Sequence, residues 1–273
     1  MKGLIFAGCS FTWGQGLYYY SDLENQVIMN DGNFNQINIT DAQIKMKNTM
    51  YFPRLVANHF NTFEITKKDN GGSEYSSYRF VNSLFNRYLR NDNVDLYSDF
   101  KYEDFEYIIF QTSQLGRNNF KFTYKEKEYD MFVPLNGSVW NEDEQKILLE
   151  WLIENDLTYN QWFDIFRNQV FEKLKNFFIL YESKGIKCKL ICWMDDLLDL
   201  IKNDSYMIER FIPLYYNEKK YDTIKYLTDL NNHLLISGDS ENLKISIMDH
   251  HPSKECHQII ANSIIKNLEK NKI

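Results

Sequence analysis

Short apolar runs are separated along the chain by longer segments in which apolar residues recur three or four positions apart. Continuous apolar runs are typical of strands buried on both faces of a parallel sheet, and the second spacing is typical of helices with one buried face. Apolar runs and short apolar segments predict strands at residues 2–8, Phe63–Ile65, Tyr107–Phe110 and Leu243–Met248, and alternating residues predict a strand over Lys187–Trp193. The periodic segments predict helices over Phe52–Phe60, Tyr78–Arg90, Trp162–Tyr181 and from Pro252 onward.

Strands that alternate with helices imply a parallel sheet covered on both faces. We therefore predict an α/β fold, a flavodoxin-like three-layer sandwich whose central parallel sheet has about five strands. One domain is expected over residues 1–273, with insertions near 17–48 and 116–160. Within the second insertion, alternating apolar and charged residues over Phe120–Phe132 predict a β-hairpin outside the main sheet. Gly185 is expected to end the long third helix.

The composition narrows the possible partners. The 273 residues are 44% hydrophobic and 25% charged, as in globular proteins, and they carry a net charge of −7. An acidic chain argues against nucleic acid or an anionic membrane as the main partner, because both require a clustered basic surface. No run approaches the ~18 apolar residues of a membrane helix, so no membrane partner is expected.

The cysteines point to a reduced environment. Cys9, Cys188, Cys192 and Cys256 form neither a disulfide framework nor a paired metal-ligand spacing, so a cytoplasmic protein is expected. The segment ending at Cys9 looks like a lipoprotein cleavage site. Its apolar stretch is shorter than the roughly 7–15 residues of a signal-peptide core, so a first strand is the favoured interpretation.

Two motifs at opposite ends of the chain carry candidate chemistry. Gly8-Cys9-Ser10 follows the first apolar run, and Asp249-His250-His251-Pro252 follows the last one. A serine hydroxyl becomes a nucleophile when a base such as histidine removes its proton and a carboxylate orients that histidine. We interpret Ser10 as nucleophile, His251 as base and Asp249 as the orienting carboxylate. The competing interpretation of Ser10 is the cap of a following helix.

These motifs resemble the conserved blocks of the SGNH (GDSL-type) hydrolases. Gly8-Cys9-Ser10, with Gly14 nearby, is similar to the first block, and Asn70-Gly71-Gly72-Ser73 is similar to the second. Asp249, His251 and Pro252 are similar to the last block. The form of the first block resembles that of phage and environmental bacterial members.

The resemblance implies an oxyanion hole built from three donors. Backbone N–H groups of Ser10 and Gly71 match two family positions. The family's third donor is an Asn after the middle strand, and this sequence lacks it at the expected place. Ser113 is assigned as the third donor, with Gln114 and Asn118 as alternatives.

The spacing of the last block departs from the common family pattern. In that pattern the Asp lies three residues before the His, where this chain has Met248. Asp249 lies only two residues before His251. If Asp249 does not reach the imidazole, Asp195 or Asp196, beyond another predicted strand, would take its place.

The expected function is therefore the hydrolysis of carboxylic esters by a serine esterase through an acyl-enzyme. The substrate is expected to be a small-molecule or glycan ester, with removal of an acetyl group from a carbohydrate favoured. No cofactor is expected, and the lack of His-x-x-x-His spacing argues against a metal. The main alternative is a catalytically weak or inactive glycan-binding or virion structural protein on the same fold, which would be virion-associated if phage-encoded.

Overall fold

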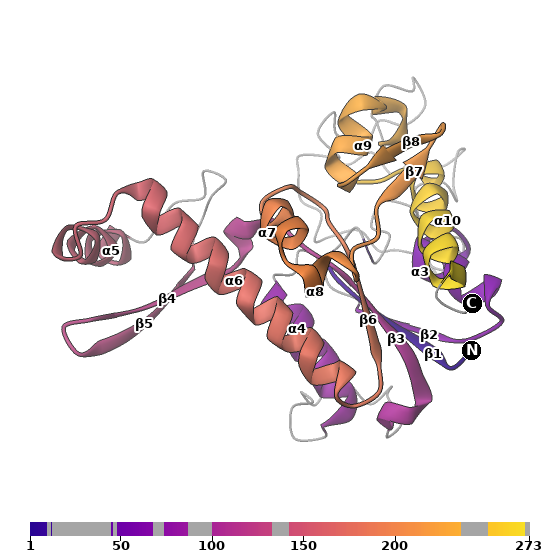
Figure 1. Ribbon diagram of the computed structural model, residues 1–273, viewed down its shortest axis with the longest axis horizontal. Coiled ribbons are helices and arrows are strands. Elements are labelled where there is room, and N and C mark those ends of the chain that lie inside the picture. Colours follow the sequence, from indigo (N-terminus) through magenta and orange to yellow (C-terminus); the bar gives the residue numbers. More distant parts are fainter. Residues whose placement is uncertain are drawn as a thin grey trace.

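The core of the fold is a parallel sheet, of which the described residues form four strands. The computed structural model describes residues 1–9, 12, 45, 48–67, 74–86, 100–132, 142–235 and 251–270. Its main sheet has the order β2-β1-β3-β6, with all three neighbouring pairs parallel (Figure 1). The strands are β1 (Gly3–Ala7), β2 (Glu64–Thr66), β3 (Phe105–Gln111) and β6 (Lys187–Ile191). The α/β class and the parallel sheet are as predicted, and the predicted strand Leu243–Met248 lies outside the described residues.

Helices cover both faces of this sheet, which makes three layers (Figure 1). They are α4 (Glu74–Phe85) and α6 (Tyr159–Glu182) on one face, and α3 (Phe52–His59) and α10 (Lys254–Lys270) on the other. The strand pleat divides the core accordingly, because successive side chains point to opposite faces. Ile5 and Ala7 of β1 pack in the core beneath α4 and α6, whereas Leu4 and Phe6 pack beneath α3 and α10.

The ends of α6 follow local chemistry that is visible in the sequence. At its start, the Thr158 side chain accepts from the Gln161 N–H at 3.4 Å, and the Gln161 side chain accepts from the Thr158 N–H at 2.8 Å. Beyond its end, Gly185 adopts a φ of +84°, as expected for a glycine that ends a helix. Helix α4 ends at Phe85, before the Arg90 that the sequence predicts.

The remaining elements connect these layers. The hairpin predicted over Phe120–Phe132 is confirmed as β4 (Asn119–Tyr124) and β5 (Lys127–Phe132). A second hairpin, of β7 (Leu214–Tyr216) and β8 (Lys219–Tyr221), was not predicted. The other helices among the described residues are α5 (Glu142–Glu154), α7 (Leu198–Asn203), α8 (Ser205–Ile208) and α9 (Ile224–Leu230), with short 3₁₀ turns at Tyr102–Asp104, Leu115–Arg117 and Asn232–Leu234.

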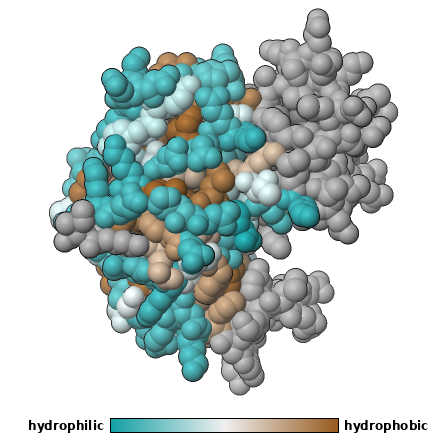
Figure 2. Space-filling view, turned by 90° about the vertical axis from the view of Figure 1, so that its right-hand side faces the viewer, coloured by the Kyte–Doolittle hydropathy of each residue, from teal (hydrophilic) through white to brown (hydrophobic). Residues whose placement is uncertain are grey.

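The β4–β5 hairpin, α5 and the first turns of α6 form an arm that extends away from the sheet, on the left of Figure 1. An aromatic cluster holds the arm together: the ring of Phe120 lies 5.6 Å from Trp151 and 5.9 Å from Trp162. These side chains belong to the same core as β3 and α4. On the opposite side of the molecule, hydrophilic residues cover most of the described surface (Figure 2).

Candidate active site

The candidate site lies at the carboxyl ends of β1 and β3. In the strand order β2-β1-β3-β6, the chain passes from β1 to β2 on one side and then crosses back to β3 on the other side of β1. Such a switch point opens a crevice beyond the strand ends, where ligands of open α/β sheets bind. Ser10 follows β1 and Ser113 follows β3, so the sequence motif and the topology point to the same edge.

Gln111, the last residue of β3, fixes the residues on both sides of Ser10. The Thr12 hydroxyl donates to Gln111 Oε1 at 2.6 Å, and Gln111 Nε2 donates to Cys9 Sγ at 3.1 Å. The side chain is 1% exposed, so these bonds form away from water. The Thr12 N–H also donates to the Cys9 carbonyl at 3.0 Å. A buried amide therefore holds Cys9 and Thr12, the described residues on the two sides of Ser10, and Ser10 itself lies outside the described residues.

Gly8 makes this close approach possible. A Cβ at Gly8 would lie 2.1 Å from Thr12 Oγ1 and 2.9 Å from Gln111 Cβ, which no side chain tolerates. The Gly8 carbonyl accepts from Lys67 Nζ and from Ser77 Oγ, each at 3.3 Å. The glycine of the first block is thus required by the packing of the turn against β3 and α4.

A buried carboxylate, Glu74, lies at the same edge of the sheet. It begins α4 and accepts from the Ser113 N–H at 2.8 Å, the Ser113 hydroxyl at 2.9 Å and Asn118 Nδ2 at 2.5 Å. Burial raises the pKa of Glu74, and these hydrogen bonds oppose that rise. Burial and the nearby Glu74 charge also raise the pKa of Tyr78.

These bonds bear on the third oxyanion donor. Both donor groups of Ser113 are directed to Glu74, and Asn118 Nδ2 donates to Glu74 and to the Leu115 carbonyl. In this conformation either residue would have to leave Glu74 before it could stabilise an oxyanion. Gly71 lies outside the described residues, and the assignment of all three donors stays a prediction.

His251 lies three residues before α10 and is partly buried. The next residue, Pro252, forms an isolated antiparallel bridge with Leu235, and the Ser253 N–H donates to the Leu234 carbonyl at 2.7 Å. Ser253 then caps α10 by accepting from the Cys256 N–H at 3.2 Å. The helix therefore begins at Lys254, two residues after the predicted start at Pro252. Asp249 lies outside the described residues.

The two alternative carboxylates lie beyond β6, as the sequence predicts. Asp196 accepts from the Leu115 N–H at 2.8 Å, and its carbonyl accepts from Arg167 Nε at 2.7 Å. Burial and the neighbouring Asp195 raise the pKa of Asp196, and the Leu115 hydrogen bond opposes the rise. Asp196 thus ties the 3₁₀ turn after β3 to the start of the loop after β6.

Sequence reasoning did not identify Gln111, Glu74 or Lys67 as parts of this edge. Gln111 carried one visible signal, a polar residue directly after the apolar run Tyr107–Phe110. Glu74 resembles any acidic residue in the first turn of a helix. The described residues contain no group of three or more His, Cys, Asp or Glu that could hold a metal ion. They also contain no helix long and apolar enough to cross a membrane.

Three solved structures resemble this chain with low TM-scores and low sequence identity, but over nearly its whole length. A carbohydrate esterase whose active site displays divergent catalytic and non-catalytic binding functions has a TM-score of 0.44 at 14% identity. A protein described as a lipolytic protein of the G-D-S-L family, from Desulfitobacterium hafniense DCB-2, has a TM-score of 0.41 at 10% identity. A family two carbohydrate esterase from Clostridium thermocellum, in complex with cellohexaose, has a TM-score of 0.38 at 13% identity.

The three comparisons differ in how much of each protein they cover. They cover 98%, 98% and 99% of this chain, and 65%, 99% and 64% of the three solved chains in the same order. The chain thus spans about two thirds of the length of both carbohydrate esterases. No protein-family model and no curated protein matches the sequence. Because all three TM-scores are below 0.5, none of these likenesses assigns an activity to this chain.

Proposed function

We propose that the chain is a serine esterase that hydrolyses carboxylic esters through an acyl-enzyme, with an acetylated carbohydrate as substrate. The observation that carries this proposal is the way Gln111 fixes Cys9 and Thr12 on the two sides of Ser10, at the β1/β3 switch point. A buried clamp on such a turn is what a preorganised nucleophile requires. The carbohydrate preference rests on the abundance of aromatic residues, with 19 Tyr and 5 Trp.

In the proposed reaction, Ser10 Oγ attacks the ester carbonyl carbon while His251 takes the serine proton. The bond to the alcohol oxygen then breaks, and His251 returns the proton to the leaving alcohol. Water attacks the acyl-serine in the second half, with His251 again as base, and releases the carboxylic acid and free serine. Asp249 holds the imidazole in the required tautomer. Backbone N–H groups of Ser10 and Gly71 stabilise the oxyanion.

The decisive experiment combines ester hydrolysis with labelling of the nucleophile. We expect the purified protein to hydrolyse p-nitrophenyl acetate, and Ser10→Ala to lower kcat by at least about a thousandfold without loss of helical circular dichroism. A fluorophosphonate probe should label Ser10, as identified by mass spectrometry of the tryptic peptides. Ser183→Ala, at an exposed serine directly after α6 and away from this edge, serves as the control. Undiminished turnover in Ser10→Ala would refute the assignment.

A second candidate function is glycan binding without catalysis, or a structural role in a virion, on the same fold. It is favoured by the hydrogen bonds that Ser113 and Asn118 make to Glu74 and to nearby carbonyls, because these bonds occupy the side-chain donors of both residues. Loss of one oxyanion donor costs about a hundredfold or more in rate. Absence of both ester turnover and fluorophosphonate labelling, with the protein folded, would select this candidate.

A further inference from the structure

A cavity of about 620 Å³ lies between α4, α6 and the β4–β5 hairpin, outside the residues of the proposed reaction. Its volume is within the roughly 300–1,000 Å³ of small-molecule sites. Tyr75, Tyr78, Arg79 and Asn82 of α4 form one wall, because positions three, four and seven apart share a helix face. Packing of the hairpin on α6 holds the opposite wall, through hydrogen bonds between Lys121 and Gln169 at 3.2 and 2.8 Å.

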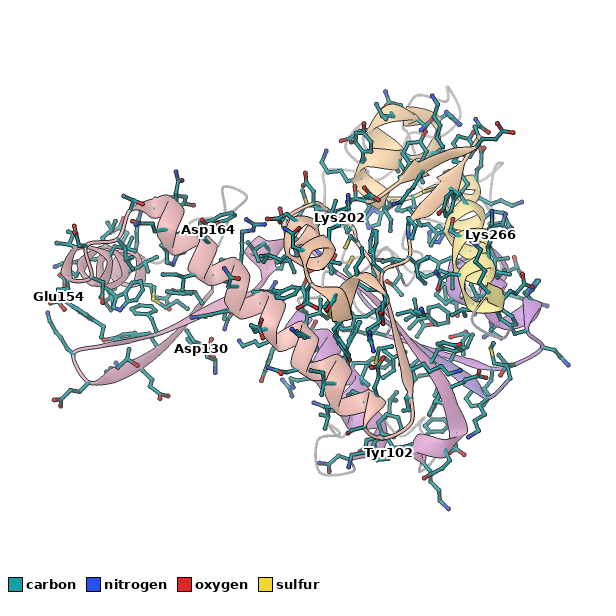
Figure 3. The ribbon with its side chains drawn as sticks, viewed as in Figure 1. Tyr102, Asp130, Glu154, Asp164, Lys202 and Lys266 are labelled. Atoms are coloured by element: carbon teal, nitrogen blue, oxygen red, sulfur yellow. The ribbon has the colours of Figure 1, made fainter. Side chains whose placement is uncertain are left out.

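The charge of this cavity is opposite to that of the whole chain. Three cationic side chains, of Arg79, Lys121 and Lys173, line it together with one carboxylate, of Asp130. Lys121 and Asp130 form an ion pair at 3.2 Å, and Asp130 lies where β5 passes α6 (Figure 3). Among the described residues, no carboxylate lies within ion-pair distance of Arg79 or Lys173. Two cations without an ion-pair partner in the described part of the chain thus line one cavity of a protein with a net charge of −7.

The cavity also offers aromatic and polar groups suited to a sugar. Tyr75 is 63% exposed, so its ring is open to a ligand in the cavity. Tyr78 is held by ring contacts with Phe110 and Phe177 at 5.5 and 4.9 Å. Its buried hydroxyl has no hydrogen-bond partner in the described part of the chain, and buried polar groups are normally satisfied. An aromatic face beside hydrogen-bonding groups matches a sugar ring, which has both C–H and O–H surfaces.

A short chain of contacts links the cavity to the candidate active site. Asn118 lines the cavity and donates to Glu74 at 2.5 Å. Glu74 in turn binds Ser113, which follows β3 at the carboxyl edge of the sheet. A ligand that entered the cavity would therefore lie along α4 with one end close to that edge.

We propose that this cavity binds an acidic segment of a glycan, with a sugar ring on Tyr75 and a sugar carboxylate held by Arg79 and Lys173. As a substrate subsite the cavity rests on the proposed esterase function, with the ester group beyond its Asn118 end. A guanidinium and an ammonium group bind carboxylates through charge-assisted hydrogen bonds. A neutral glycan would leave both cations without a partner.

The environment of Lys173 makes the proposed glycan binding depend on pH. Burial and the like charge of Lys121 lower the pKa of Lys173, with Asp130 acting in the opposite sense. A bound carboxylate favours the charged lysine and so raises that pKa again, which means that binding takes up protons. Affinity for an acidic glycan is therefore expected to fall as the pH rises through the pKa of Lys173 in the free protein.

Calorimetric titration of the Ser10→Ala protein with tetragalacturonate tests the proposal without turnover. We expect binding that is at least tenfold tighter than that of the neutral cellotetraose. Arg79→Ala and Lys173→Ala are each expected to weaken it about tenfold, because each removes one charge-assisted contact. Lys146→Ala, which removes an exposed lysine of α5 outside the cavity lining, is the matched control and should change nothing.

Three results would overturn the proposal: equal affinity for the two tetrasaccharides, no effect of the Arg79 and Lys173 substitutions, or sulfate binding as tightly as tetragalacturonate. The last would mark a site for simple anions.

A second assay separates the esterase proposal from the glycan-site proposal. It measures hydrolysis of p-nitrophenyl acetate by Arg79→Ala and Lys173→Ala variants that retain Ser10. Normal turnover without selective glycan binding rejects the cavity alone. Selective binding without any ester turnover rejects the esterase and retains the acidic-glycan site.

Discussion

At the scale of single residues, the candidate site is built from polar groups that are distant in sequence. Gln111 contacts Cys9 and Thr12 across about a hundred positions, and Glu74 contacts Ser113 across 39. Local sequence identifies Ser10 and His251 as candidates because serine and histidine have known chemistry in such motifs. It does not identify Gln111 or Glu74, because their roles depend on which strands become neighbours.

The clamp between Gln111 and Thr12 can be measured by a double-mutant cycle. Gln111→Leu leaves the Thr12 hydroxyl buried without its acceptor, so we expect a loss of about 1–3 kcal/mol in the free energy of unfolding. If the clamp positions Ser10, kcat for p-nitrophenyl acetate should fall while KM stays nearly constant. Urea denaturation and steady-state kinetics supply both quantities.

Thr12→Val serves as the second arm of this cycle. Because Gln111→Leu and Thr12→Val remove the same hydrogen bond, their effects on stability should not add. The double variant should be less destabilised than the sum of the single ones. Strict additivity would show that the two side chains do not act as a pair.

Glu74 predicts an unusual pH dependence of stability. Its pKa is raised by burial, so the folded state holds the carboxyl proton more tightly than the unfolded state does. Its contribution to stability is therefore highest at low pH and is lost as the pH rises from the ordinary value of 4.5 through the raised pKa. The free energy of unfolding, measured for wild type and Glu74→Gln from pH 4 to 8, tests this.

We expect wild type to lose stability relative to Glu74→Gln as the pH rises through the raised pKa of Glu74. Glu74→Gln has no proton to exchange at this position, so its own stability should lack that component. The pKa of Tyr78 should also fall in the variant, because one of its causes, the Glu74 charge, is removed. A pH-independent difference would mean that the carboxyl group has the same pKa in both states.

At the scale of elements, the sequence predicts the long and strongly patterned segments and fails at short ones. β1 and β3 contain apolar runs, β6 begins with an alternation of lysine and apolar residues, and the period of α6 is clear over its whole length. The β7–β8 hairpin has strands of three residues each, with the polar segment Lys219–Lys220, so no period can be recognised. The start of α10 was misplaced because Pro252, although suited to a first turn, is held in a bridge to Leu235.

Gly185 gives a prediction at this scale. Its φ of +84° lies in the region that side chains disfavour, and a Cβ would meet no atom within 4 Å. Gly185→Ala should therefore lower the free energy of unfolding by about 1–2 kcal/mol through backbone conformation alone. Lys184→Ala, at the neighbouring exposed position, is the control and should lie within ~0.5 kcal/mol of wild type. Urea denaturation of both variants makes the comparison, and equal stability would contradict a conformational role for Gly185.

At the scale of the whole molecule, the sheet and the arm are joined by one continuous core. Phe120 of the hairpin and Trp162 of α6 belong to the same buried cluster as Phe110 of β3 and Val81 of α4. Strand β1 joins this cluster to a second one, because Ile5 and Ala7 pack in the first cluster and Leu4 and Phe6 pack in the second, on the opposite face of the sheet. The sequence predicts the hairpin but not its attachment, because the contacts between its aromatic residues and α6 depend on the tertiary fold.

This shared core predicts that the arm does not unfold separately from the sheet. Separation of β4 and β5 from α6 would expose Phe120 and Trp162, and exposing one large apolar side chain costs about 1.5–3 kcal/mol. Native-state hydrogen exchange at increasing urea concentrations tests this by following peptides from residues 119–132 and 105–111. Amides of the arm should join the same global unfolding transition as those of β3. If the arm exchanges through a separate opening of much lower free energy, then it is an independent unit, and the cavity that it forms with α4 and α6 would open and close without unfolding of the sheet.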